Sequence, residues 1–468
     1  MRLGAAALLC SLLPLPLALA CADKDGPPAE DAGIVEDAQS PDSGTADAGT
    51  PPDSGEIVCP EQGIPPDPDT VVQACPPLGM ELDPGAGPPR RGDMSVAVDE
   101  RCGRVIMFYG DRAEPVMCNP AASDFLTDAW TFDLARGRWA QIDVAAGPAP
   151  LRRARGSAVW DPASNRLIQF GGRYRAGTSG AYTYLNDVWA FDPSTASWTE
   201  LSAQGAAGAP AGRMNSVMVM DAARNRVLIH GGGRVAASGT EYTVDNQTWA
   251  FDLGAGSWAQ LGTTGAPTPR LFHVAALDRM RSRLFVFAGA GRDALTAPSF
   301  FRDLWYLDLT SDTWTEVPAT AELPAGRIKG VLTADPARDR LLLFAGHDDG
   351  SLGNDNDLWS FDLASLAWTR VIEGDTWNAP ALGQCDFPAN FALIDPCSPE
   401  RRESHVFEIL GNRAIMHGGR TDCGLANDTW ILDLRTMRWS QVNGSFTGMT
   451  CFRSGRTDCN DQGAKKCG

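Results

Sequence analysis

Pairs of tryptophans nine positions apart recur along this chain and constrain its fold more than any other feature. One pair lies in "NDVWAFDPSTASW", residues 186–198, where an Asp-Pro turn separates the two aromatic residues. The pairs account for twelve of the 14 tryptophans, and their second members are 54 to 71 residues apart. They are Trp130/Trp139, Trp189/Trp198, Trp249/Trp258, Trp305/Trp314, Trp359/Trp368 and Trp430/Trp439. Six copies at such an interval indicate an internal repeat.

Each copy contains four short apolar runs in the same order. An arginine precedes the first run, and glycines end the second, as in "RLIQFGG" and "RVLIHGG". The third carries an acidic or amide step before the first tryptophan, as in "NDVWAFD", and the fourth carries the second tryptophan. Such runs between turn residues predict four antiparallel strands per copy. In a hairpin with an even-length loop, residues i and i+9 can lie opposite each other, so we expect the two tryptophans to form a direct cross-strand pair.

A single four-stranded sheet of this kind is apolar on both faces, and radial stacking into a propeller supplies the neighbours it needs. The double glycine, the N-D-x-W step and the second tryptophan make the chain resemble kelch-repeat β-propellers over about residues 88–444. The resemblance implies an all-β fold, a six-bladed kelch propeller with four-stranded antiparallel blades. The usual exchange of a terminal strand is not evident. The "MELD" segment at residues 80–83 or the carboxy-terminal tail could supply it, or the ring could close without exchange.

The amino terminus predicts export. Residues 1–20, "MRLGAAALLCSLLPLPLALA", read as a signal peptide that is too short and proline-broken to span a membrane. The signal ends in "ALAC", which resembles a bacterial lipobox, so we expect Cys21 to be lipidated; the alternative is ordinary cleavage near Ala20. Ala22 points to an anchor at the outer membrane or cell surface.

The organisation that follows has five parts. Residues 21–56 are rich in Asp, Ala, Gly, Pro and Ser, which predicts a disordered tether. A short cysteine-containing lead-in covers 57–87, the propeller covers 88–444, and a cysteine-containing tail covers 445–468, after the signal peptide at 1–20.

Cysteine usage favours disulfides. Of 12 cysteines, Cys10 lies in the signal and Cys21 is the lipidation candidate, which leaves 12 − 2 = 10, an even number in an exported chain. A zinc site is the weaker alternative, because no C-x-x-C pair occurs. Connectivity is not determined by sequence, but the sequence-near pairings are Cys59–Cys75, Cys102–Cys118, Cys385–Cys397, Cys423–Cys451 and Cys459–Cys467.

The loops between second and third strands are long and different in every copy, whereas the first and third turns are short. Variable loops on a rigid scaffold are where such folds hold ligands, so we expect binding on this long-loop face. Two sets of basic residues should lie there. The strand-start arginines precede the first strands: Arg91, Arg153, Arg213, Arg270, Arg327 and Arg402. The loop arginines follow the glycines, with a histidine in the fifth copy: Arg112, Arg173, Arg234, Arg292, Arg420 and His347.

Guanidinium groups match carboxylates, sulfates and phosphates in a bidentate geometry, so both sets are candidate contacts for an anionic ligand. The alternative is structural. Kelch repeats commonly place an arginine before the first strand, where it pairs with carboxylates of the same or the next blade, and the loop arginines could brace the loops. A formal net charge of −18 and the lack of a basic stretch argue against nucleic acid.

The sequence therefore predicts a surface-tethered binding or interaction module for an anionic glycan or an acidic protein segment. A carbohydrate-active enzyme similar to the bacterial sialic acid mutarotases is the alternative, and a purely structural envelope protein is a third. Galactose oxidase is also a kelch propeller. With five histidines, six tyrosines and no repeat-placed cysteine for its crosslink, we expect no such copper site, no other metal and no cofactor. No residue is assigned a catalytic role.

Overall fold

The computed structural model of the chain describes residues 75, 78–83, 86–112, 124–177, 180–295, 299–348, 353–377, 392–393, 395, 397–421 and 424–444. The chain divides into two units, Met1–Glu56 and Ile57–Gly468, and all described residues belong to the second. The predicted signal peptide, Cys21, the tether and the tail at 445–468 lie outside the described residues. Within the described part, no helix is long and apolar enough to cross a membrane.

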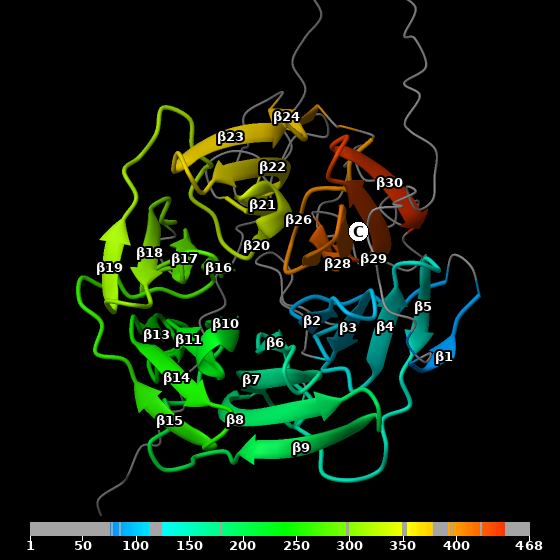
Figure 1. The fold of residues 1–468 in the computed structure, drawn as a ribbon, viewed down its shortest axis with the longest axis vertical. Coiled ribbons are helices and arrows are strands. Elements are labelled where there is room, and N and C mark those ends of the chain that lie inside the picture. The colour runs from blue at the N-terminus through cyan, green and yellow to red at the C-terminus, as the bar shows by residue number, and fades with distance from the viewer. Residues whose placement is uncertain are drawn as a thin grey trace, which may run out of the picture. The chain divides into compact units, whose positions relative to one another are not determined.

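Six four-stranded antiparallel sheets surround a central axis (Figure 1), each built from one copy of the repeat. The first strands, nearest the axis, are β2 (Ser95–Asp99), β6 (Ser157–Asp161), β10 (Val217–Asp221), β16 (Val274–Asp278), β20 (Val331–Asp335) and β27 (Val406–Leu410). The second strands are β3 (Arg104–Phe108), β7 (Arg166–Tyr174), β11 (Arg226–His230), β17 (Arg283–Phe287), β21 (Arg340–His347) and β28 (Arg413–Thr421).

The outer half of each blade consists of the hairpin that carries the tryptophans. The third strands are β4 (Ala129–Asp133), β8 (Thr183–Asp192), β14 (Thr248–Asp252), β18 (Leu304–Asp308), β22 (Asn354–Asp362) and β29 (Gly424–Asp433). The fourth strands are β5 (Arg138–Gln141), β9 (Ser197–Ser202), β15 (Ser257–Gln260), β19 (Thr313–Glu316), β23 (Ala367–Ile372) and β30 (Arg438–Asn443). The all-β, six-bladed fold expected from the repeat is confirmed.

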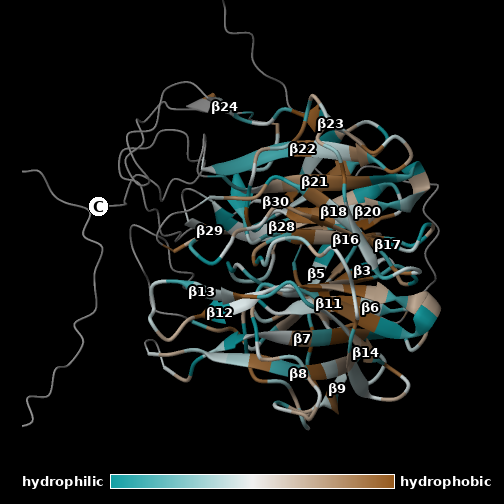
Figure 2. Ribbon diagram, turned by 90° about the vertical axis from the view of Figure 1, so that its left-hand side faces the viewer, coloured by the Kyte–Doolittle hydropathy of each residue, from teal (hydrophilic) through white to brown (hydrophobic). Residues whose placement is uncertain are grey.

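A few short elements lie outside this scheme. They are the ribbon β12 (Gly233–Val235) with β13 (Tyr242–Val244), the ribbon β24 (Thr376–Trp377) with β25 (Ala392–Leu393), β26 (Arg402–Glu403) beside β28, and the 3₁₀ turns η1 (Ala222–Arg224) and η2 (Pro336–Arg338). Figure 2 shows hydrophobic residues concentrated on the blade strands. These residues pack between neighbouring blades, as where Phe108 of the first blade meets Phe191 and Trp198 of the second at ring-centroid distances of 4.7 Å. The core is therefore a series of interfaces between blades.

The two tryptophans of a copy are not directly opposite each other, so the predicted direct pairing is wrong. Trp139 pairs with Phe132, and Trp130 pairs with Gln141. The reason is the position of the turn: strand β4 continues to Asp133 and pairs it with Arg138, which moves the register by two residues. Both tryptophans still lie on one face, because strand side chains alternate with a period of two. The ring centroids of Phe132 and Trp139 are 5.2 Å apart.

Within the described residues, the ring closes without strand exchange. All four strands of the first blade come from residues 95–141, and all four of the last from 406–443. The "MELD" segment forms β1 (Met80–Glu81), which pairs with β5 as an added outer strand of the first blade. Side-chain and backbone hydrogen bonds join the first blade to the last. The Trp139 indole N–H donates to Thr429 Oγ1 at 2.9 Å, and the Asp93 amide donates to the Ser404 carbonyl at 3.2 Å.

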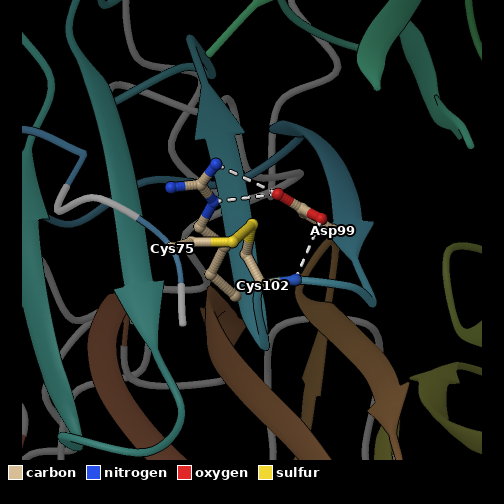
Figure 3. Close-up of a disulfide and its surroundings, with 4 residues drawn as sticks. Cys75, Asp99 and Cys102 are labelled. Carbon is tan, nitrogen blue, oxygen red and sulfur yellow. Dashed lines mark hydrogen bonds and ion pairs between the residues drawn. A yellow bond between two sulfur atoms is a disulfide. The ribbon is translucent and has the colours of Figure 1, made fainter. Parts of the chain in front are cut away.

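One disulfide joins Cys75 to Cys102, so the predicted pairings Cys59–Cys75 and Cys102–Cys118 are wrong. Cys102 lies in the first turn of the first blade, and its amide donates to Asp99 at 3.2 Å (Figure 3). The bond therefore fastens the lead-in to the propeller. Cys397 is also disulfide-bonded. The other predicted cysteines lie outside the described residues: Cys59, Cys118, Cys385, Cys423, Cys451, Cys459 and Cys467.

The closure of the ring by Trp139 is testable. Trp139 packs on His417 with ring centroids 4.4 Å apart, and Trp314 packs on His230 at 4.6 Å, but the Trp314 indole N–H has no hydrogen-bond partner in the described structure. Trp139→Phe should therefore lower the free energy of unfolding by about 1–2 kcal/mol more than Trp314→Phe, because both lose similar volume and only one loses a buried hydrogen bond. Urea unfolding of the two variants measures this difference. Equal losses would mean that this bond contributes nothing to closure.

Candidate binding site at the mouth of the central channel

The strand-start arginines are buried and have intramolecular partners. Arg153 is fully buried, and its guanidinium donates to both carboxylate oxygens of Asp187 at 2.7 and 2.8 Å. Its Nε donates to the Leu151 carbonyl at 2.8 Å, and Nη1 also donates to the Gly171 carbonyl at 2.9 Å. The same carboxylate accepts the indole N–H of Trp189 at 2.8 Å. This Arg–Asp–Trp brace explains the spacing of the N-D-x-W step.

The Arg–Asp–Trp brace recurs around the propeller. Five blades contain it in full: Arg91–Asp128–Trp130, Arg153–Asp187–Trp189, Arg270–Asp303–Trp305, Arg327–Asp357–Trp359 and Arg402–Asp428–Trp430. The third blade differs, because Gln247 accepts from its tryptophan while Arg213 reaches Asp245 at 3.4 Å. Charged groups out of water need such partners, so this geometry favours the bracing alternative for the strand-start arginines.

Electrostatics agree with a bracing role. Burial alone would raise the pKa of Asp303, but hydrogen bonds and charge from Arg270 outweigh it and hold that pKa below its usual value. Asp128 and Asp428 have lowered pKa values for the same reason, with Arg91 and Arg402 as their partners. Because a lowered folded-state pKa favours the ionised form, these pairs stabilise the fold above the unfolded pKa. Their contribution is lost as the pH falls through the folded value.

The loop arginines do not converge on one point. Arg112 and Arg292 are exposed and pair with Asp124 at 2.5 Å and Glu241 at 2.7 Å. Arg173 is buried over the Tyr182 ring, 4.4 Å from its centroid, and lies 3.9 Å from Asp111.

The remaining members of this set also have separate surroundings. Arg420 pairs with Glu403, and His347 shares a hydrogen bond of 3.0 Å with Asn354. Arg234 is exposed, and it forms no ion pair with any residue that the structure describes. Five of the six predicted contacts thus have partners in their own loop or in a neighbouring segment, and no single pocket collects the set.

A different ring of residues lies at the long-loop end of the channel, two positions after each strand-start arginine. All six residues have φ between 53° and 60°, a left-handed backbone that is uncommon outside glycine. Backbone hydrogen bonds of 3.0 to 3.2 Å link neighbours at five steps around the ring. The members of this channel ring are Asp93, Arg155, Asn215, Phe272, Lys329 and Ser404. These residues were not predicted from the sequence, although their fixed distance from the arginine was a signal that could have identified the position.

The channel ring surrounds a cavity of about 160 Å³. Two cations lie over one aromatic ring there: the Arg155 guanidinium and the Lys329 ammonium are each 5.6 Å from the centroid of Phe272. Arg155 also pairs with Asp93 at 2.7 Å, and Lys329 lies 3.5 Å from Glu403. The site is therefore basic and aromatic, with its cations already oriented.

Polar atoms without partners complete the site. Asn215 Oδ1 and Ser404 Oγ are buried and have no hydrogen-bond partner in the described structure. His405 lines the same cavity, and neither of its ring nitrogens has such a partner. Burial lowers the pKa of His405 to about 3, with Arg402 adding to the effect, so the imidazole is neutral near pH 7. The described residues contain no group of three or more His, Cys, Asp or Glu that could hold a metal ion.

Together, six blades of four strands, the Arg–Asp–Trp brace and the double glycine define a kelch-type β-propeller. The family described as the KLHDC2/KLHL20/DRC7 Kelch-repeats domain matches residues 81–242 and 222–385, and the chain belongs to this family. Propellers of this family are typical of protein-interaction modules.

Three relatives illustrate the range of proteins that contain similar repeats. Acyl-CoA-binding domain-containing protein 5 of Arabidopsis thaliana is 23% identical over 65% of this chain and 41% of its own length. The host cell factor homolog hcf-1 of Caenorhabditis elegans is 23% identical over 60% of this chain and 33% of its own. Kelch domain-containing protein 1 of Mus musculus is 25% identical over 46% and 53%. In each case this chain covers less than two thirds of the relative.

The Arg–Asp–Trp brace yields a stability prediction. Asp187→Asn should lower the free energy of unfolding by about 3–5 kcal/mol, because it leaves the Arg153 guanidinium buried without its counter-ion. The matched control is Asp124→Asn, which breaks an exposed ion pair and should cost less than about 1 kcal/mol. Chemical unfolding followed by tryptophan fluorescence measures both. Similar small losses in the two variants would show that the brace is not required for stability.

Proposed function

We propose that this chain is a protein-interaction module that binds an acidic segment of a partner protein at the channel ring on the long-loop face. The observation that carries the proposal is the pair of cations, Arg155 and Lys329, each 5.6 Å from the centroid of the Phe272 ring. An acidic side chain entering the cavity would meet both cations, and its carbon atoms would contact the Phe272 ring. The family supports the coarser part of the proposal, because its propellers are typical of protein-interaction modules.

Charge and unpaired polar atoms support an acidic ligand. The residues that line the cavity include two cations, Arg155 and Lys329, and one carboxylate, Asp93. A chain of net charge −18 that concentrates positive charge at one point can select an anionic segment there and repel it elsewhere. The open acceptor Asn215 Oδ1 and the hydroxyl of Ser404 can pair with backbone amide and carbonyl groups. A cavity of about 160 Å³ suits one carboxylate side chain.

The binding experiment uses the full chain and fluorescein-labelled peptides rich in Asp and Glu, with Asn/Gln peptides as uncharged counterparts. The acidic peptides should bind, and the affinity should fall with added salt. Lys329→Gln and Arg155→Gln should each weaken binding at least about tenfold, the loss expected for a buried charged hydrogen bond. Arg292→Gln, an exposed loop arginine, is the matched control and should change little. Fluorescence anisotropy measures all of these affinities.

Other outcomes of that experiment would contradict the proposed site, the proposed ligand or the proposed function. Binding that is equal in Lys329→Gln, Arg155→Gln and wild type would place the ligand outside the channel ring. A parallel panel of sialylated and sulfated glycans tests the other anionic class, and binding of those alone would favour glycan recognition. Turnover of an anionic sugar by the wild-type protein would support the enzymatic alternative.

We also propose that the chain is exported and anchored through acylated Cys21, supported by the "ALAC" sequence after the apolar run. Expression in a Gram-negative host with an alkyne-labelled fatty acid should label the wild-type protein and place it in the membrane fraction. Cys21→Ser should abolish the label and release the protein, because two or more acyl chains are what make such anchoring stable. An unlabelled wild-type protein with its first residue after Ala20 would instead indicate ordinary signal cleavage.

A further inference from the structure

The channel has a second cavity, of about 610 Å³, which opens on the opposite face, among the short first turns of the blades. Its lining comes from the first strands of all six blades and is mostly apolar, with one representative from each blade in turn: Val98, Trp160, Met220, Leu277, Leu332 and Ile409. This volume lies within the range of pockets that hold small organic ligands. The lining also sets it apart from the channel ring, whose chemistry is basic and polar.

An acidic side chain in the middle of a first strand interrupts the apolar lining. Glu408 belongs to β27, lines the cavity and is partly buried. It makes no hydrogen bond or ion pair with the residues that the structure describes. Its neighbours on the strand, Phe407 and Ile409, are apolar, and Ile415 is its register partner on β28. Val96 and Val98, on the adjacent first strand β2, are apolar as well.

The other charged groups of the cavity lie on the first turns or at the strand ends beside them, and they include Arg101 and Asp278, the second of which pairs with Arg281 at 3.1 Å. Glu100 and Arg279 are exposed and 3.7 Å apart, and Arg340 donates to Asp335 at 2.9 Å. Asp339 accepts from Arg281 at 2.7 Å. Burial raises the pKa of Glu408 to about 7, and the negative charge of Glu100 adds to the rise. Among the described residues, Glu408 has no cation as an ion-pair partner, and its carboxyl group lies on a first strand whose neighbours in the lining are mostly apolar.

We propose that this cavity binds an organic cation with a hydrocarbon body, an alkyl- or arylammonium ion, with Glu408 as its counter-ion. The apolar strands would cover the hydrocarbon part, and the Trp160 ring offers a face on which a cation can rest. An anionic ligand would place like charges together, and a neutral one would leave Glu408 without a partner. This site differs from the acidic-segment site in face, charge and ligand.

The affinity of the wild-type site for a cation should depend on pH. The carboxyl of Glu408 is ionised only above its pKa of about 7, so a cation competes with a proton for it. For a probe whose charge does not titrate, affinity should fall about tenfold between pH 8 and pH 6. This dependence requires no substitution and so does not depend on any variant folding.

The test is isothermal titration of the full chain with benzyltrimethylammonium, whose charge is fixed, and with uncharged benzyl alcohol. Wild type should bind the cation with the stated pH dependence and bind the alcohol at least about tenfold more weakly. Glu408→Gln should lose about tenfold in affinity for the cation at pH 8 and lose the pH dependence. Asp124→Asn, which removes an exposed carboxylate outside this cavity, is the matched control and should change affinity by less than about twofold.

Stability provides a check on the Glu408 variant. Because burial raises the folded-state pKa of Glu408 to about 7, ionising its carboxyl group lowers the free energy of unfolding. This loss of stability grows as the pH rises from the unfolded pKa to about 7 and is constant above that. Replacing Glu408 with glutamine removes it. Glu408→Gln should therefore melt at a higher temperature than wild type at pH 8 and show little difference near pH 4. The proposal is overturned if wild type does not bind the cation, if the alcohol binds equally well, or if Glu408→Gln binds with unchanged affinity. Lys329→Gln should leave this binding unchanged, which separates the site from the channel ring.

Discussion

The propeller depends on one buried ionic interaction, the Arg–Asp–Trp brace, which five blades repeat in full and a sixth in altered form. Each guanidinium joins the segment before its first strand to the second and third strands or the residues at their ends, as Arg153 does with Leu151, Gly171 and Asp187. A charge in a low-dielectric interior is tolerated only when its partners are in place, so the brace forms fully or destabilises the blade. It thereby fixes three strands at the long-loop end and leaves the loops themselves free to vary.

The channel ring follows from the same constraint. Because each arginine holds the backbone just before its first strand, the residue two positions later is forced toward the axis in a left-handed conformation. The backbone of the ring is thus repeated, while its side chains are not: Arg155 and Lys329 both lie near the Phe272 ring, and Asn215 and Ser404 add open polar atoms. A regular scaffold in this way supports one asymmetric site, which is what a specific interaction requires.

The two ends of the channel then acquire opposite chemistry. At the long-loop end, the starts of the first strands bring arginine and lysine to the axis; toward the other face, the strands themselves line the channel with apolar side chains around Glu408. The division arises because residues inside a first strand must pack against neighbouring blades and are mostly apolar. Residues before the strand have no such requirement. The two faces of the channel therefore differ in the charge of their lining residues, which is the basis of the two binding proposals.

The sequence by itself determined the repeat, the strand order, the number of blades and the position of the bracing arginines, since these depend on local periodicity and turn residues. Tertiary structure decided what depends on distances between separate segments. A turn that begins after Asp133 moved Trp139 opposite Phe132, and the disulfide joined Cys75 to Cys102 because the lead-in returns to the first turn. The loop arginines that are paired have separate partners at separate places around the face, so the set did not gather. Only the closed ring brought Arg155, Phe272 and Lys329 together and left Glu408 alone among apolar strands, because each of these residues belongs to a different blade.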